Sequence, residues 1–510
     1  MARSIYIYAR TKTSRRVDIM TYKFLILNFD VKNNEYFFKE AIEQETGEIL
    51  TLENLINVQE PTTYYCDKLH IFFLYAVKFL HQNDFVNSKD VKTIEDKQFF
   101  FSYRSGKCSN ITIKNKVNIL FVDFKSKFGL EFGDYITNAE LLEYAIKHGR
   151  IGKTLGHDAF NEFLHTKFKV PIVVPLSNDI MREDYPIMHN AMLNRAKLSC
   201  SGFQFVKSGT YENVFEYDQS SAYPAQLLGC TPQGQGNLFE KLEDVPPNYF
   251  KIISFCAMDC KLKKNKIDFV SLPKAINDVV LPERLFELFK ENYSGIIKIR
   301  QILAFKTRKN VFNKFINKNI IAGKLGENRP HIAKYNKYIA NSLTGYFGRN
   351  EETSISYVKF NGKKMTLKSE KIKIDPIYLP VYIYTLDKSK TEFIRQLQNN
   401  YANIIYANTD GFISTKELDI EKLNFENSCN VGLYRCKHIF KELYIECING
   451  YAGITTDGAV ENTISGLTLT RKITPQEYQQ RKILYSYNTI TDNGTFVRKT
   501  IDIDGNEQQC

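Results

Sequence analysis

The first part of this chain carries apolar runs of two kinds. Short runs at 3–8 and 117–124 are typical of strands, and longer periodic runs at 70–81 and 139–147 are typical of helices. This mixture predicts a protein that combines α-helices and β-strands.

The middle of the chain shows a strand, a helix and a hairpin separated by turn-forming residues. Residues 212–218 predict a strand, and residues 330–343 predict a helix that a proline opens. Residues 403–414 contain two apolar strands around an Asn-Thr-Asp-Gly turn, which predicts a hairpin. The Gly- and Pro-containing stretches at 232–237 and 245–247 predict loops that open an inserted module.

Length and composition indicate a globular protein of several units. Of the 510 residues, 43% are hydrophobic and 25% are charged, so we expect about two to four domains. No apolar run approaches the ~18 residues of a membrane-spanning helix, and the first residues lack the apolar centre of a signal peptide. The ten cysteines include one close pair, Cys256 and Cys260, and no metal-binding set. We therefore expect reduced thiols, a cytoplasmic location and no membrane partner.

Positive charge is concentrated in one stretch of the chain. The formal net charge is +12, and residues 305–350 contain ten basic residues against the single acidic Glu327. Interleaved cations and aromatic rings are typical of nucleic-acid channels, whereas a charge run alone is usually a solvated face. The basic residues are Lys306, Arg308, Lys309, Lys314, Lys318, Lys324, Arg329, Lys334, Lys337 and Arg349, and the aromatic residues are Phe305, Phe312, Phe315, Tyr335, Tyr338, Tyr346 and Phe347.

Three short segments carry side chains that suit one chemical site. Asp218 ends a predicted strand, where a carboxylate beside free carbonyl groups suits a cation such as Mg²⁺. Asp410 lies at the tip of the predicted hairpin and could face a second metal ion. Lys337 and Asn341 are four residues apart on the predicted helix and share a face. Each segment alone is also explained by a cap, a turn or a solvated helix, so only their combination predicts a site.

Together these segments resemble motifs A, B and C of the family B DNA polymerases. Their patterns are Asp-x-x-Ser-Leu-Tyr-Pro, Lys-x-x-x-Asn-Ser-x-Tyr-Gly and Tyr-x-Asp-Thr-Asp-Ser. The matching residues are Asp218, Ser221, Tyr223 and Pro224 in motif A, Lys337, Asn341, Ser342 and Gly345 in motif B, and Tyr406, Thr409 and Asp410 in motif C. The departures are Ala222, Thr344, Asn408 and Gly411.

The chain looks most like the protein-primed branch of that family, which uses a terminal protein as primer on linear viral or plasmid genomes. VFNKFINK at 311–318, DPIYLPVYIYT at 375–385 and the long interval between motifs A and B indicate that branch. The resemblance implies an α+β right-hand polymerase with palm, fingers and small thumb, and an N-terminal exonuclease-like α/β domain. The implied parts are the exonuclease-like domain 1–195, palm 196–230, inserted module 231–304, fingers 305–350, second small insertion 351–374, palm 375–455 and thumb 456–510.

The resemblance also implies phosphoryl transfer assisted by two Mg²⁺ ions, or by Mn²⁺ in their place. Asp218 and Asp410 are the implied catalytic metal ligands, and the backbone carbonyl of Gln219 assists them. The implied nucleotide contacts are Tyr223 beneath the sugar, Lys334 and Lys337 on the phosphates, and Asn341 on the nascent base pair. The expected DNA contacts are Lys309, Lys314, Lys318 and Tyr451.

Several positions depart from the family pattern. Asn408 replaces a carboxylate beside the metals, and Thr344 replaces an aromatic ring beside the incoming base. Asn449 stands where a lysine precedes the tyrosine that matches Tyr451. In the exonuclease-like region, the four positions that carry carboxylates in the family align with Ala9, Thr11, Phe72 and His148. We therefore expect an exonuclease-like fold without exonuclease activity or proofreading.

The function that these residues favour is a DNA-directed DNA polymerase that uses primer-template DNA, deoxynucleoside triphosphates and a terminal protein. One alternative is a nucleotidyltransferase with reduced template dependence, which Asn408 and Thr344 suggest. Another is a non-catalytic DNA-binding protein derived from a polymerase. A reverse transcriptase is disfavoured because motif C lacks two adjacent aspartates.

Overall fold

The computed structural model describes most of the chain. The described residues are 7–8, 19–32, 35–56, 58–69, 71–72, 98–104, 107–114, 118–150, 152, 154–165, 187–270, 276–325, 327–348, 352–360, 365–373, 378–418, 431–464, 468–469, 471–480, 485–490, 496–501 and 507–509. None of the helices in these ranges is long and apolar enough to cross a membrane.

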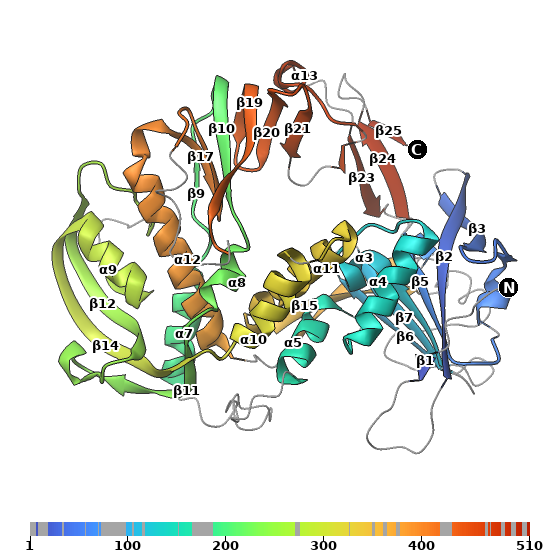
Figure 1. Cartoon of the computed structure of the whole chain (residues 1–510), viewed down its shortest axis with the longest axis horizontal. Coiled ribbons are helices and arrows are strands. Elements are labelled where there is room, and N and C mark those ends of the chain that lie inside the picture. Colours follow the sequence, from blue (N-terminus) through green and yellow to red (C-terminus); the bar gives the residue numbers. More distant parts are fainter. Residues whose placement is uncertain are drawn as a thin grey trace.

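The N-terminal unit is a mixed sheet with helices packed against it (Figure 1). Its strand order is β4-β3-β2-β5-β8-β7-β6, with β1 beside β2, and the central strands β2, β5 and β8 are parallel. The strands are β1 (Ile7–Tyr8), β2 (Ile19–Lys32), β3 (Glu35–Glu43), β4 (Ile49–Leu50), β5 (Thr62–Cys66), β6 (Gln98–Arg104), β7 (Lys107–Lys114) and β8 (Asn118–Asp123). The helices are α1 (Leu52–Ile56), α3 (Phe124–Phe128), α4 (Tyr135–Lys147) and α5 (Leu155–His165).

The central sheet is antiparallel and has the order β21-β20-β19-β10-β18-β17-β9. These strands are β9 (Gln204–Val206), β10 (Gly209–Gln219), β17 (Ile404–Asn408), β18 (Gly411–Ser414), β19 (Tyr434–Cys447), β20 (Gly450–Thr455) and β21 (Val460–Ile464). Helices α7 (Ile187–Ser199), α8 (Ala222–Gln226) and α12 (Leu379–Asn399) accompany it. Tyr217 and Phe412 share a buried core with Ile383 and Phe393 of α12, so α12 covers one face of this sheet.

A second antiparallel sheet is formed within residues 230–309, which follow motif A in sequence and include the start of the basic stretch. Its order is β11-β14-β12-β13, from Cys230–Phe239, Tyr293–Lys309, Tyr249–Leu262 and Ile276–Pro282, and α9 (Glu283–Asn292) packs on it. The predicted loop at 232–237 is wrong, because these residues lie within β11. The strand is irregular there: its pairing shifts between Gln233 and Asn237, where Gly234 and Gly236 adopt positive φ.

The basic stretch continues into three consecutive helical segments, α10 (Asn313–Ile316), η2 (Asn317–Leu325) and α11 (Pro330–Phe347). Helix α11 lies between α4 and α5 of the N-terminal unit on one side and α8 and α12 on the other (Figure 1). A two-stranded sheet follows, β15 (Glu352–Phe360) and β16 (Met365–Lys373). The last elements are β22 (Thr468–Leu469), α13 (Pro475–Gln479), β23 (Tyr485–Ile490), β24 (Phe496–Ile501) and β25 (Glu507–Gln509).

Most of the predicted elements are confirmed. The expected strand at 212–218 is β10, the expected helix at 330–343 is α11, and the hairpin at 403–414 is β17 and β18. The predictions at 117–124 and 139–147 correspond to β8 and α4. Most of 3–8 and 70–81 lies outside the described residues.

Candidate active site

Two carboxylates meet on the central sheet although they are far apart in the sequence. Asp218 lies at the end of β10, directly opposite Gly411, the first residue of β18. Asp410 immediately precedes Gly411 in the β17–β18 turn, where Thr409 adopts a left-handed φ of 62°. The amide of Gln219 donates a hydrogen bond to the backbone oxygen of Asp410 (3.2 Å). The strand register thus places the two aspartates close to each other, as the motifs predict.

The electrostatics of this pair favour a cation. Burial and the nearby charge of Asp218 raise the pKa of Asp410 to about 6, although Lys337 opposes the shift. The side chain of Asp218 is partly accessible, and the Arg435 guanidinium lies 3.9 Å from its carboxylate. Two carboxylates that repel each other in a partly buried site are stabilised when a divalent cation binds between them.

A cluster of cations faces the two aspartates. Lys324 of η2 donates hydrogen bonds to the hydroxyls of Ser221 (2.9 Å) and Ser220 (3.2 Å). Burial, Lys337 and Arg435 lower the pKa of Lys324 to about 8, while Asp218 opposes the shift. Sequence reasoning assigned no role to Lys324 or Arg435, because no motif spacing distinguishes them. The only signal for Lys324 was its position in the basic stretch.

Tyr223 stands beside this site on the short helix α8. Burial, Asp410 and Tyr382 raise the pKa of its phenol, so the hydroxyl stays protonated. The neighbouring Gln219 is buried, and its side-chain amide donates to the Gly432 oxygen (2.8 Å), which ties β10 to the segment before β19. That hydrogen bond holds the backbone that carries the predicted carbonyl ligand.

The chain was compared with known proteins in sequence and in structure. No protein-family model matches the chain. The DNA polymerase of Streptococcus phage Cp-1 is 23% identical in an alignment of 286 residues that covers 50% of this chain and 49% of that protein. The matched segment therefore spans about half the length of the relative.

Solved structures of phi29 DNA polymerase match nearly the whole chain. Its complex with primer-template DNA matches with a TM-score of 0.73 and 18% identity, covering 96% of this chain and 100% of that one. Its complex with primer-template DNA and incoming nucleotides gives the same TM-score at 19% identity, covering 96% and 99% of the two chains. The chain has the phi29 DNA polymerase fold. The expected right-hand polymerase with an exonuclease-like domain is confirmed, and so is the resemblance to protein-primed family B polymerases at the level of fold.

Within this polymerase fold, the residues expected to hold the nucleotide differ in their surroundings. The positive charge of Lys337 opposes the rise in the pKa of Asp410, and Lys337 also lies near Lys324. Lys334, one turn earlier on α11, is exposed, with its ammonium 5.9 Å from the centre of the Tyr338 ring. The side-chain oxygen of Asn341 is buried and has no hydrogen-bond partner among the described residues. The geometry thus associates Lys337 with the carboxylates, whereas no described interaction connects Lys334 with them.

Asn408 and Asn449, both departures from the family pattern, contact each other. The Asn408 amide donates to the side-chain oxygen of Asn449 (2.6 Å), and its own oxygen accepts from Gln204 (3.2 Å) and the Thr409 hydroxyl (3.1 Å). Two neutral side chains therefore meet where the family pattern has a carboxylate and a lysine. Tyr451 is buried, and its hydroxyl donates to Glu216 (3.4 Å), so its contact with DNA stays a prediction.

The basic stretch does not form one continuous stacking surface. Five of its seven aromatic residues are buried in the protein core, namely Phe305, Phe312, Phe315, Tyr335 and Phe347. These five buried rings cannot stack on bases, so the aromatic part of this pattern reflects core packing. Lys309 and Lys314 are exposed, whereas Lys318 forms an ion pair with the buried Glu162.

Four positions of the exonuclease-like unit align with the family's carboxylates, and two of them lie within the described residues. Phe72 is buried against Phe38 and Phe121, and the ring of His148 packs against that of Tyr144 with ring centres 4.0 Å apart. Neither position presents a carboxylate. Ala9 and Thr11 lie outside the described residues. Across the described ranges, no group of three or more His, Cys, Asp or Glu side chains could hold a metal ion.

Proposed function

We propose that the chain is a DNA-directed DNA polymerase that replicates a linear viral or plasmid genome by protein priming and does not proofread. The observation that carries this proposal is the pairing of Asp218 with Asp410 near the cations Lys324, Lys337 and Arg435. Acidic groups that bind metal and cations that bind triphosphate are the two parts that phosphoryl transfer needs.

The donor set fits two Mg²⁺ ions, with Mn²⁺ as the alternative. Asp218 and Asp410 supply carboxylate oxygens, Gln219 supplies a backbone carbonyl, and hard divalent cations prefer such oxygen ligands. The raised pKa of Asp410 agrees with this assignment, because a bound cation relieves the repulsion between the aspartates. When bound, the ions activate the primer hydroxyl and neutralise the charge that develops on the transferred phosphoryl group.

The other side chains bind and orient the nucleotide. Lys324 and Lys337 hold the triphosphate, with Lys334 as a further candidate from the sequence. Tyr223 packs beneath the sugar and excludes a 2′-hydroxyl, and Asn341 packs against the nascent base pair. Phi29 DNA polymerase has been solved with primer-template DNA and incoming nucleotides, and we propose that this chain takes the same ligands, with Lys309, Lys314, Lys318 and Tyr451 on the DNA. For the palm, fingers, thumb and inserted modules we propose the boundaries that the sequence resemblance implies.

Primer extension tests this function. The purified protein is incubated with Mg²⁺, one deoxynucleoside triphosphate at a time and a primer on a template of defined sequence. Incorporation of only the complementary nucleotide supports the proposal. Incorporation regardless of the template supports the nucleotidyltransferase alternative, and DNA binding without incorporation supports the non-catalytic one.

Replacing Tyr223 with alanine should change which sugar the enzyme accepts. Removal of the ring opens space at the 2′ position, so we expect discrimination against ribonucleotides to fall by about 10- to 200-fold while deoxynucleotide incorporation continues. The measurement is kcat/KM for each sugar in primer extension. Tyr223→Phe keeps the ring and should keep the discrimination. Unchanged discrimination in Tyr223→Ala would show that the ring is only structural.

DNA binding should depend on salt through the exposed lysines of the basic stretch. The double variant Lys309→Gln, Lys314→Gln should flatten the plot of log affinity against log salt, by about 0.9 units for each duplex phosphate that the variant no longer neutralises. The control replaces Lys241 and Lys264, which are exposed on the inserted module. Equal slopes for the wild type and the Lys309, Lys314 variant would mean that these two lysines are solvated surface residues that do not contact DNA.

A further inference from the structure

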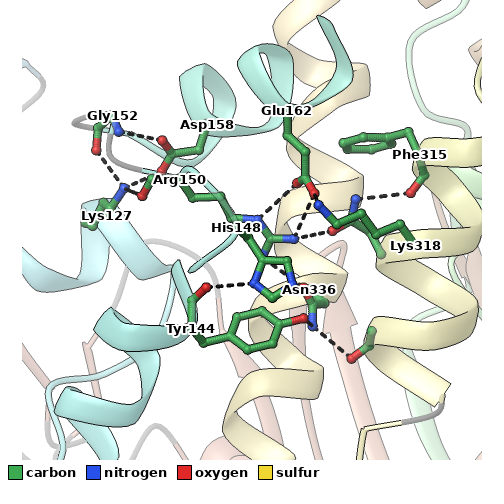
Figure 2. Close-up of polar contacts among 12 residues, drawn as sticks. Lys127, Tyr144, His148, Arg150, Gly152, Asp158, Glu162, Phe315, Lys318 and Asn336 are labelled. Carbon is green, nitrogen blue, oxygen red and sulfur yellow. Dashed lines mark hydrogen bonds and ion pairs between the residues drawn. The ribbon is translucent and has the colours of Figure 1, made fainter. Parts of the chain in front are cut away.

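Arg150 of the exonuclease-like unit is fully buried, and its guanidinium joins three helical segments. It donates to the Glu162 carboxylate of α5 (3.0 Å), to the Asn336 oxygen of α11 (2.9 Å) and to the Asn319 oxygen of η2 (2.6 Å). Figure 2 shows the side chains of Arg150, Glu162 and Asn336 pointing toward one another. Arginine suits this position because its planar fork directs several donors at once.

The surroundings hold Arg150 in one place. The rings of Tyr144 and Tyr335 lie 5.5 and 5.2 Å from the guanidinium carbon, within cation–π range. The buried Lys127 donates to the backbone oxygens of Arg150 (2.8 Å) and Gly152 (2.7 Å) and forms an ion pair with Asp158. Asp158 and Glu162 are four residues apart and so project from the same face of α5.

The buried ions compensate one another in charge. Burial opposes ionisation of Glu162, but Arg150 and Lys318 outweigh it and hold the pKa of this carboxyl below its usual value. Glu162 therefore stays charged and binds Arg150 from the exonuclease-like unit and Lys318 from η2 together (Figure 2). Removing one member of such a set leaves an unpaired buried charge, which is costly.

The contacts of Arg150 extend to residues next to Lys324 and Lys337. The Asn336 amide donates to the Gly323 oxygen (2.9 Å) and the Tyr144 hydroxyl (2.9 Å). Asn336 immediately precedes Lys337, and Gly323 immediately precedes Lys324. A Cβ at Gly323 would lie 2.8 Å from the Asn336 side chain, so the close approach of η2 and α11 requires glycine there.

We propose that Arg150 is a positioning residue for nucleotide binding. Through Asn319 and Asn336 it locks η2 against α11, and this fixes Lys324 and Lys337 in the spacing that a triphosphate requires. The exonuclease-like unit thus contributes to polymerisation as the support of the fingers. This inference rests on the proposed polymerase function.

The first test is Asn336→Ala, which cuts the connection between Arg150 and α11 without removing a charge. We expect the KM for the complementary deoxynucleotide to rise on the order of tenfold, with little change in kcat or in primer-template affinity. The matched control is Asn292→Ala, because Asn292 is also fully buried and hydrogen-bonded but lies in α9 of the inserted module. It should lower thermal stability and leave KM unchanged.

The second test is Arg150→Lys, which keeps the charge beside Glu162 but cannot bind both asparagines. Nucleotide binding is also measured without chemistry, as the Kd of the nucleotide for the complex with a dideoxy-terminated primer. A rise in KM and Kd for both Asn336→Ala and Arg150→Lys supports the proposal. Unchanged KM and Kd in either folded variant overturn it. A wild type that neither extends primers nor binds nucleotide overturns the proposed function, and this inference with it.

Discussion

Asp410→Asn should abolish nucleotide incorporation and at the same time make the protein more stable. The amide has nearly the size of the carboxylate but carries no charge, so it binds a divalent cation weakly. We expect incorporation to fall by about 10³-fold or more, the scale of losing metal-assisted charge stabilisation in the transition state. Asp218→Asn should have the same effect on activity. DNA affinity should change little, because neither side chain is a phosphate contact.

The gain in stability follows from the pKa of Asp410. The folded protein raises this pKa from 3.8 to about 6, so folding favours the protonated carboxyl. The stabilisation is fully present below the unfolded pKa and is lost as the pH rises through about 6. At pH 7 the ionised side chain therefore lowers the free energy of unfolding of the metal-free protein, by up to about 3 kcal/mol. The neutral amide should remove this penalty.

Urea denaturation at pH 7 with a metal chelator measures this stability, and primer extension with Mg²⁺ measures activity. Asp457→Asn is the control, since Asp457 lies outside the site and is hydrogen-bonded to Thr455. A variant that is inactive and less stable would mean that Asp410 has a structural role. Substantial extension by Asp218→Asn or Asp410→Asn would contradict the assigned metal site.

Lys324→Met should weaken nucleotide use more than Lys334→Met does. Lys324 is held beside Ser220 and Ser221 near Asp218, whereas Lys334 is exposed. A charged hydrogen bond to phosphate contributes about 1.5–3 kcal/mol, so we expect kcat/KM for the nucleotide to fall about 10- to 100-fold in Lys324→Met. Steady-state primer extension measures both variants. A larger loss in Lys334→Met would reassign the triphosphate to the exposed face of α11.

The lowered pKa of Lys324 adds a pH signature. Its ammonium loses its proton near pH 8, so kcat/KM of the wild type should decline above that pH, because a neutral amine attracts phosphate weakly. Lys324→Arg stays charged and should lack this decline. Identical pH profiles for the two proteins would show that Lys324 does not contact the triphosphate.

Much of the candidate site was predictable from the sequence because its signals are local. A strand that ends in Asp218, a turn that presents Asp410 and a proline-opened helix that carries Lys337 each depend on a few neighbouring residues. Turn chemistry, periodicity and helix-start preferences act over such short distances. For the same reason, the order of the motifs indicated the polymerase fold before any tertiary contact was known.

Tertiary structure decided everything that depends on segments distant in sequence. The interleaved basic and aromatic residues are typical of a nucleic-acid channel, yet Phe305, Phe312 and Phe315 are buried, because an aromatic side chain also suits a protein core. Likewise, the strand in place of the loop at 232–237 results from pairing with β14.

The cation cluster and the Arg150 contacts also could not be predicted from the sequence. Lys324 lies near Asp218 only because the folded chain brings η2 to Ser220 and Ser221, which follow β10. Arg150 likewise reaches Asn336 across 186 positions of the chain. No spacing rule encodes such pairs, since burial and partner geometry arise when the chain folds. The sequence therefore determined which residues form motifs A, B and C, and folding determined which other residues lie beside them.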